Sequence, residues 1–140
     1  MVSRIHQASA VAIRGRAVLI EGPSGSGKSS LALALIDRGA QLIGDDGVTL
    51  DAREGRLFAS PPPTIAGLIE VRNLGLLTMP TASDVPVGLV LRLDPAALRF
   101  IEAAERTGLN GIDLPLIRLW PDGPGGAIKA ELALDRYGLT

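Results

Sequence analysis

Short runs of apolar residues, separated by glycine, proline and charged residues, follow one another along the whole chain. The continuous apolar runs at 17–20 and 87–91 predict strands buried on both faces, and 41–44 predicts a shorter buried strand. Residues 30–36 are helix formers and predict a helix that extends to about Arg38 and ends at Gly39. Strands on both sides of a helix favour a mixed α/β fold.

Turn residues and prolines mark the other elements. Asp94-Pro95 predicts a helix to about Arg106, because an acidic cap followed by proline is typical of a helix start. The remaining expected elements are a strand at 5–13 forming a hairpin with 17–21, a hairpin of 48–51 with 56–59, an alternating segment at 69–72, an apolar segment at 74–79, a strand at 114–120 and a helix at 127–137. Together they predict a single domain over residues 1–140, with flanking helices around a mixed sheet.

Composition narrows the classes of function. The chain has 140 residues, a formal net charge of −1 and no cysteine. The small charge argues against nucleic acid or an anionic membrane as the main partner, and the missing cysteine excludes disulfides and thiolate metal sites. Residues 1–7 lack the apolar stretch of a signal peptide, and no apolar run approaches the ~20 residues of a membrane span. We therefore expect a cytoplasmic protein.

Residues 22–29 read Gly-Pro-Ser-Gly-Ser-Gly-Lys-Ser and match the phosphate-binding loop pattern G-x-x-x-x-G-K-[ST]. The loop follows an expected strand and precedes an expected helix, so its N–H groups can surround phosphate oxygens at a helix N-terminus. Lys28 is expected to reach the β- and γ-phosphates, and the Ser29 hydroxyl to help hold Mg²⁺. The residues expected to contact the phosphates are Gly22, Pro23, Ser24, Gly25, Ser26, Gly27, Lys28, Ser29 and Ser30. The sequence thus predicts binding of ATP or a close phosphate analogue.

Asp45 and Asp46 follow the strand that comes after the phosphate-loop helix. If that strand is a parallel neighbour of the loop strand, its end brings both carboxylates beside the loop. Mg²⁺ bound to phosphates usually takes one or two carboxylates, and a second carboxylate can accept a proton from an incoming hydroxyl. Asp-Asp-Gly is equally typical of a simple turn. On spacing alone, both interpretations stay open.

Several segments resemble the catalytic domain of HPr kinase/phosphorylase. They are His6 and the stretches at 17–29, 31–39, 42–46 and 65–75. The most specific part is Glu70-Val71-Arg72-Asn73-Leu74-Gly75, where the family signature reads Glu-Val-Arg-Gly-Leu-Gly. This chain has Asn73 at the position of the family's first glycine. From residue 87 to 137 the resemblance is loose.

The resemblance implies an enzyme that phosphorylates a serine of HPr, a phosphocarrier of the sugar phosphotransferase system, with ATP or pyrophosphate as donor. It also implies removal of that phosphate by phosphorolysis. Transferred to this chain, Lys28 holds the donor phosphates, Asp45 is the base toward the serine, and Arg72 steadies negative charge. Ser29, Asp46 and Glu70 form the Mg²⁺ environment, and His6 lies near the reaction centre.

The chain departs from the family pattern at three places. We expect no N-terminal domain, because the sequence starts directly at the catalytic core. Arg99 and Arg106 fall where the family carries a loop arginine tied to phosphate removal, and residues 124–127 read Pro-Gly-Gly-Ala instead of Pro-Gly-Arg-Asn. The kinase reaction is therefore better supported than the phosphorylase reaction. The alternatives are a nucleotide-binding sensor without phosphoryl transfer and a small-metabolite kinase, and the oligomeric state, a homo-oligomer included, stays open.

Overall fold

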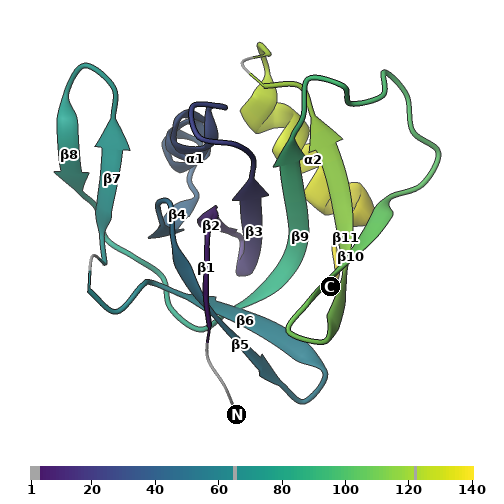
Figure 1. Ribbon diagram of the computed structural model, residues 1–140, viewed down its shortest axis with the longest axis horizontal. Helices are drawn as coiled ribbons and strands as arrows, with labels where there is room; N and C mark the ends of the chain where they lie inside the picture. Colours follow the sequence, from purple (N-terminus) through teal and green to yellow (C-terminus); the bar gives the residue numbers. More distant parts are fainter. Residues whose placement is uncertain (1–3, 65, 122) are drawn as a thin grey trace.

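A curled sheet flanked by two helices forms the frame of the molecule (Figure 1). The computed structural model describes residues 4–64, 66–121 and 123–140; Ile65, part of the segment that carries the resemblance, lies outside them. The strands are β1 (Arg4–His6), β2 (Ser9–Ile13), β3 (Arg16–Glu21), β4 (Gln41–Gly44), β5 (Val48–Arg53), β6 (Arg56–Ser60), β7 (Leu68–Val71), β8 (Gly75–Thr78), β9 (Val85–Leu93), β10 (Glu105–Leu109) and β11 (Ile112–Leu119). The helices are α1 (Lys28–Asp37) and α2 (Gly126–Tyr137).

Three parallel strands determine where the molecule can build a site. The nine-stranded sheet has the order β1-β5-β6-β9-β3-β2-β4, and β11 joins it through β9 while β10 pairs with β11. β9 is parallel to both β3 and β11, whereas the other pairs are antiparallel. The carboxyl ends of β3, β9 and β11 therefore meet at one edge, which is where ligands bind in open α/β sheets. β7 and β8 form a separate hairpin, which stands apart beside α1 in Figure 1.

Hydrophobic side chains fill both faces of the central strands. Along β3, Val18 and Ile20 pack in the cluster that contains Leu35 of α1 and Leu134 of α2. The alternating Ala17 and Leu19 pack in a second cluster with residues of β5, β6 and β11. Because successive side chains of a strand point to opposite faces, the continuous apolar run at 17–20 is buried throughout, as the sequence predicts.

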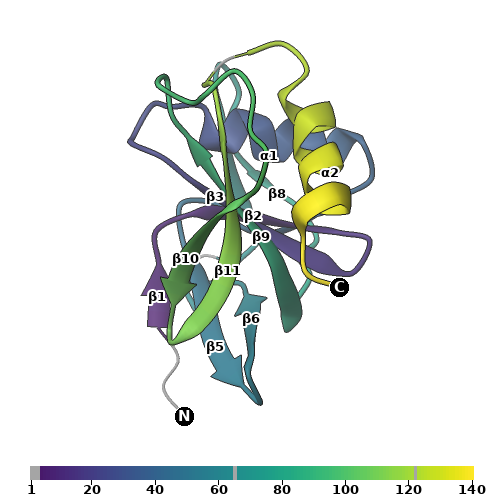
Figure 2. The same cartoon turned by 90° about the vertical axis from the view of Figure 1, so that its right-hand side faces the viewer.

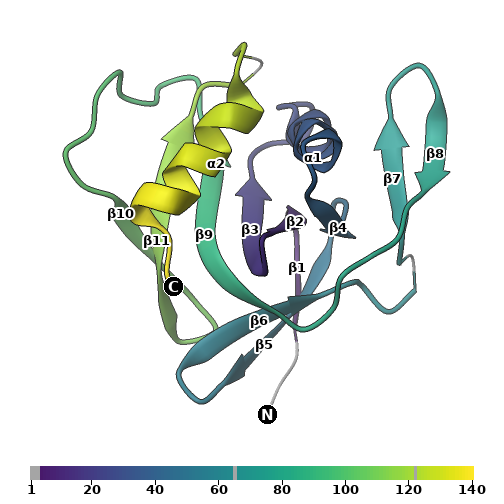
Figure 3. The same cartoon turned by 180° about the vertical axis from the view of Figure 1, so that it is seen from behind.

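The two helices lie next to each other and cover one face of this part of the sheet. Figure 2 shows them adjacent, and Figure 3 shows α2 across β9 and β11. Arg38, at the end of α1, donates a 3.0 Å hydrogen bond to Glu131 of α2. The expected cap at Gly39 is confirmed: its φ is 108°, and the N–H groups of Gly39 and Ala40 bond back to Ile36 and Leu35. Within the described ranges, no helix is long and apolar enough to cross a membrane.

The segment expected as one strand at 5–13 is two strands. β2 pairs with β3 as expected, but β1 leaves this hairpin and pairs with β5. The break falls at residues 7–8, where the chain passes from one partner to the other. The hairpin of β5 with β6 is confirmed, and Glu54 and Gly55 both take positive φ in its turn, as a type I′ turn requires.

The helix expected at 94–106 is absent from this described segment, and the expectation is wrong. Asp94 accepts the N–H of Ala96 at 2.8 Å, and its other oxygen accepts from Arg118 at 3.0 Å. These bonds hold a single turn that the chain does not continue. Glu105–Leu109 instead pairs with β11 along five residue pairs, so long-range strand pairing outweighs the local helix signal.

Candidate functional site

The phosphate loop lies between β3 and α1 with a close-packed backbone. Gly25 and Gly27 take φ of 79° and 100°, which glycine adopts without strain. A Cβ on Gly22 would lie 2.6 Å from the Ser26 hydroxyl, so the first glycine is required for space. Lys28 donates a 2.7 Å hydrogen bond to the Gly22 carbonyl, which places its charge over the loop.

Within the described part of the chain, the Ser26 hydroxyl has no hydrogen-bond partner although it is buried. Buried polar groups are almost always bonded, so an unsatisfied hydroxyl inside a phosphate-binding loop indicates a place for a ligand oxygen. The loop therefore offers its N–H groups, one hydroxyl and one ammonium group to an anion.

Asp45 joins three elements at the foot of this loop. Its Oδ1 accepts hydrogen bonds from Ser29 of α1 at 2.6 Å and from Ser9 of β2 at 3.0 Å. Its Oδ2 accepts the backbone N–H of Glu70 in β7 at 2.9 Å. The residue is only 9% exposed, and both carboxylate oxygens are engaged.

The route by which Asp45 reaches the loop differs from the expected one. β4 is not a hydrogen-bonded parallel neighbour of β3, because β2 lies between them and is antiparallel to both. Two antiparallel steps restore the direction of β3, so the end of β4 still points toward the loop. The expected proximity is confirmed, while the expected pairing is wrong.

Asp46 lies in a different environment from its neighbour. It is exposed, has a φ of 62°, and lines a cleft of about 370 Å³ together with Lys28 and Ser29. Aspartate tolerates this left-handed conformation better than most residues. The turn thus directs one carboxylate inward and leaves the adjacent one at the cleft.

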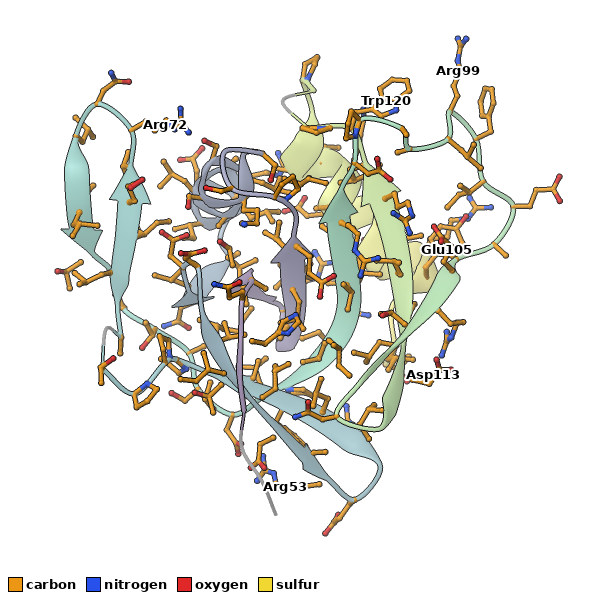
Figure 4. All side chains as sticks on the ribbon, viewed as in Figure 1. Arg53, Arg72, Arg99, Glu105, Asp113 and Trp120 are labelled. Atoms are coloured by element: carbon orange, nitrogen blue, oxygen red, sulfur yellow. The ribbon has the colours of Figure 1, made fainter. Side chains whose placement is uncertain are left out.

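The β7–β8 hairpin forms the other wall of this cleft. Glu70 and Arg72 are exposed and line it with Leu68 and Leu76, and Figure 4 shows Arg72 on the side of the hairpin next to α1. Asn73 has a φ of 75°, a conformation that glycine adopts freely and asparagine tolerates. Asn73 therefore adopts a conformation that a glycine at this position could also take.

His6 belongs to a cluster with Glu21 and Arg92, at the end of β3 just before the loop. Its Nε2 lies 2.7 Å from Glu21, and Glu21 also accepts bonds from Arg92 at 2.6 and 3.1 Å. Burial opposes ionisation of Glu21, but the hydrogen bonds from His6 and Arg92 outweigh it and lower the pKa of this carboxyl. Glu21 and Arg92 were not predicted from the sequence. A charged residue directly before Gly22, at the end of a buried strand, was the available signal.

The arginines of the 94–108 segment do not line this cleft. Arg106 pairs with Asp113 in the β10–β11 hairpin, at 3.0 Å. Arg99 is exposed on the loop at the opposite side of the molecule from Arg72 (Figure 4). Neither of these two arginines therefore lies at the cleft in this structure.

The donor set near Ser29 fits Mg²⁺. The Ser29 hydroxyl and Asp45 provide the hard oxygen ligands that this ion prefers, and Asp46 lines the same cleft. In the ranges that the structure describes, no three acidic or histidine side chains converge as a closed metal cage. An ion held by one or two carboxylates, water and substrate phosphates requires no such cage.

Known proteins are similar to this chain in sequence. The model of the HPr Serine kinase C-terminal domain family matches residues 2–83. An HPr kinase/phosphorylase of Clostridium tetani is 43% identical over 93% of this chain and 48% of the relative, and one of Streptococcus thermophilus is 34% identical over 78% and 40%. The chain thus spans about half the length of the curated relatives it matches.

A solved structure extends the similarity beyond residue 83. The Hpr(Ser) kinase/phosphatase from Coxiella burnetii superimposes with a TM-score of 0.81 and 28% identity, over 94% of this chain and 89% of that one. The mixed α/β fold expected from the sequence is therefore confirmed. The chain belongs to the HPr Serine kinase C-terminal domain family.

Proposed function

We propose that this chain is a protein serine kinase domain that transfers a phosphoryl group to a serine of an HPr-type phosphocarrier. The donor is ATP, or pyrophosphate as a shorter substitute, bound with Mg²⁺ on the phosphate loop. The hydrogen bond between Ser29 and Asp45 carries this proposal. In phosphate-loop enzymes a loop Ser or Thr and a strand-end Asp hold the metal, and this chain brings that pair within 2.6 Å.

The surroundings of the two aspartates favour a division of labour opposite to the one that the resemblance suggested. Asp45 is buried and bonded through both oxygens, so it suits the metal side of the site and is poorly placed to meet a substrate. Asp46 is exposed at the cleft and suits the proton acceptor. We therefore assign Asp46 as the base and Asp45, with Ser29, as the metal partner.

In the proposed reaction, the serine hydroxyl of the carrier attacks the terminal phosphorus of the donor. The new serine–phosphorus bond forms while the bond to the leaving phosphate oxygen breaks, and the hydroxyl proton passes to Asp46. Lys28 and Arg72, both at the cleft, face the charge that spreads over the transferred group. Bound Mg²⁺ supplies neutralisation of the charge on the donor oxygens.

His6 and Glu70 take supporting roles in this proposal. His6 lies outside the lining of the cleft and bonds to Glu21, which directly precedes the loop, so we assign it a positioning role. The Glu70 backbone N–H orients Asp45, while its carboxylate faces the cleft and can bind the metal through water.

The deciding experiment is incubation of the chain with radiolabelled ATP, Mg²⁺ and an HPr-type carrier. We expect label on a serine of the carrier, and loss of labelling in Asp46→Asn. The matched control Arg56→Ala removes an exposed charge on the β5–β6 hairpin and should transfer normally. A sensor would bind ATP and label nothing, whereas a small-metabolite kinase would consume ATP only with a small hydroxyl substrate.

The reverse reaction belongs to the same proposal. An oxygen of inorganic phosphate held by the loop and Lys28 would attack the phosphorus of the phosphoserine. A new P–O–P bond would form while the serine O–P bond breaks, pyrophosphate would be released, and Asp46 would return a proton to the serine oxygen. Arg72 lines the cleft and can stabilise the charge on the transferred phosphate, whereas Arg106 pairs with Asp113 away from the cleft. We therefore expect weak but detectable phosphorolysis. Labelled carrier, enzyme, Mg²⁺ and phosphate should release pyrophosphate. Kinase turnover without any pyrophosphate would limit this chain to one direction.

A further inference from the structure

A second cavity lies on the other side of the phosphate loop. It has a volume of about 500 Å³ and lies between the start of α1, the segment after β11 and the start of α2. Gly27 and Ser30 line both this groove and the cleft that contains Asp46. The two cavities therefore meet at the loop itself, and a ligand that occupies the loop can extend into both.

The lining of the groove suits a flat aromatic ligand. Trp120 is 49% exposed at its rim, and its indole N–H is held by the Ala97 carbonyl at 2.7 Å, which fixes the ring. Leu31, Leu93 and Leu119 form the apolar surface, and Gly123 and Gly126 bring bare backbone to the wall. Figure 4 shows Trp120 near the start of α2, well apart from Arg72 across the loop.

The far end of the groove is polar. Asp37 is exposed there, and the side chain of the neighbouring Arg38 is hydrogen-bonded to Glu131. Helix α1 rises about 1.5 Å per residue, so Asp37 lies roughly 10 Å along the helix from Ser30. An apolar groove with an acceptor at its end matches a base on a ribose that carries hydroxyl donors.

We infer that this groove binds the nucleoside of the donor nucleotide, with the base against Trp120 and the ribose hydroxyls toward Asp37. The inference rests on the proposed function, because it takes the donor phosphates to lie on the loop. The transferred phosphate faces the cleft that contains Asp46. The nucleoside end of the donor therefore extends from the loop toward the opposite side, where the groove lies. A pyrophosphate donor would leave the groove empty.

The experiment compares two ligands that share the phosphates and differ in the nucleoside. Mg²⁺·ATP and Mg²⁺·tripolyphosphate are titrated by calorimetry, and the fluorescence of Trp120, the single tryptophan of the chain, is followed in parallel. We expect ATP, and not tripolyphosphate, to change the fluorescence. Both ligands should lose affinity in Lys28→Ala.

Two variants test the groove itself. Trp120→Ala removes the stacking surface and should weaken ATP binding about tenfold, as loss of an aromatic–base contact does. Ala34→Phe fills the groove from the exposed side of α1 and should weaken ATP binding at least as much. Tripolyphosphate affinity should stay unchanged in both. Phe100→Ala and Leu132→Phe make matched changes at exposed positions outside the groove, and ATP should bind them as it binds the parent.

The outcomes separate the two proposals. If the parent binds both ligands but Trp120→Ala and Ala34→Phe bind ATP normally, the groove does not hold the nucleoside and the kinase proposal stands. If an apolar peptide and not ATP changes the fluorescence of Trp120, the groove is a protein-docking site and the inference is overturned. If the parent binds neither ligand, the proposed function fails and this inference fails with it.

Discussion

At the scale of single residues, Asp45 and Asp46 show how one turn gives adjacent carboxylates opposite environments. Asp45 is enclosed by Ser9, Ser29 and the Glu70 amide, whereas Asp46 takes a left-handed φ and remains exposed. Its burial and hydrogen bonds give Asp45 a part in stabilising the fold, in addition to the metal-binding role that we propose for it. Exposure leaves Asp46 free to meet a substrate.

Substitution should separate these two carboxylates. Asp46→Asn should stop phosphoryl transfer with little change in Mg²⁺·nucleotide affinity or in the free energy of unfolding. Asp45→Asn should weaken metal-dependent binding and lower stability by about 1–3 kcal/mol, because an amide group then faces hydrogen-bond donors in a buried place. Calorimetric titration measures the nucleotide affinity, urea denaturation measures the free energy of unfolding, and the labelling assay measures phosphoryl transfer. Equal loss of nucleotide binding in both variants would contradict the separate roles.

The ionised side chain of Glu21 makes a contribution to the free energy of unfolding that depends on pH. Its pKa is lower in the folded chain than its ordinary value of 4.5, despite burial, because His6 and Arg92 bond to the ionised form. A carboxyl with a lowered folded pKa stabilises the fold above its unfolded pKa and loses this contribution as the pH falls through the folded pKa. The contribution is therefore complete at neutral pH and disappears in acid.

We expect Glu21→Gln to be less stable than the parent by about 2 kcal/mol at neutral pH, since bonds to a charged acceptor are lost. The difference should shrink in acid, as the pH falls far enough below 4.5 for Glu21 of the parent to become protonated. Urea denaturation at neutral and acidic pH measures it, and Glu54→Gln, at an exposed turn, is the control. A difference that does not change with pH would show that Glu21 is not ionised in the folded chain.

At the scale of elements, the predictable parts are those that local sequence determines. The phosphate loop, α1 with its Gly39 end, and the β5–β6 hairpin each carry their signal within a few residues. β1 and β10 could not be predicted, because each is defined by a partner strand distant in the sequence. At 94–106 a valid helix-start signal is outweighed by the Asp94–Arg118 contact and by pairing with β11.

The site follows the same rule. Lys28 and Ser29 could be located by motif, while the inward and outward directions of Asp45 and Asp46 depend on a φ value that spacing does not reveal. The Glu21–Arg92 pair joins residues 71 positions apart, so no local pattern contains it.

The end of α1 offers a test at this scale. Gly39 has a φ of 108°, which an L side chain rarely adopts, so Gly39→Ala should lower stability by about 1 kcal/mol. Gly108, in β10, has open space around its Cβ position and no positive φ. Gly108→Ala should leave stability unchanged or raise it by a few tenths of a kcal/mol. Thermal unfolding compares them, and equal effects would contradict the assigned cap.

At the scale of the whole molecule, the parallel trio β3, β9 and β11 places two cavities on either side of one loop. The cleft between the loop and the β7–β8 hairpin carries Lys28, Asp46, Glu70 and Arg72, whereas the groove on the other side of the loop is mainly apolar, with Asp37 and Arg38 at its far end. A donor in the groove and an acceptor at the cleft would approach the loop from opposite sides. This arrangement would let a protein substrate reach the site without displacing the nucleotide.

Ligand binding should stabilise the whole fold. A ligand that binds only the folded state at a concentration about 100 times its dissociation constant adds about 2.7 kcal/mol to the free energy of unfolding. We expect Mg²⁺·ATP to raise the melting temperature of the parent and to leave that of Lys28→Ala unchanged. Differential scanning calorimetry with and without nucleotide measures the shift. An equal rise in the variant would show that ATP binds away from the loop.

The hydrogen bond from the Glu70 amide to Asp45 gives the hairpin a means of sensing the loop. A ligand that moved the Asp45 carboxylate from the Ser29 side would also change its hydrogen bond to β7, and would thereby couple the loop to the hairpin that lines the cleft. Amide hydrogen exchange at Glu70 should then report on the occupancy of a site whose nucleotide it does not touch. Through one carboxylate, the proposed kinase could recognise its acceptor differently before and after the donor binds.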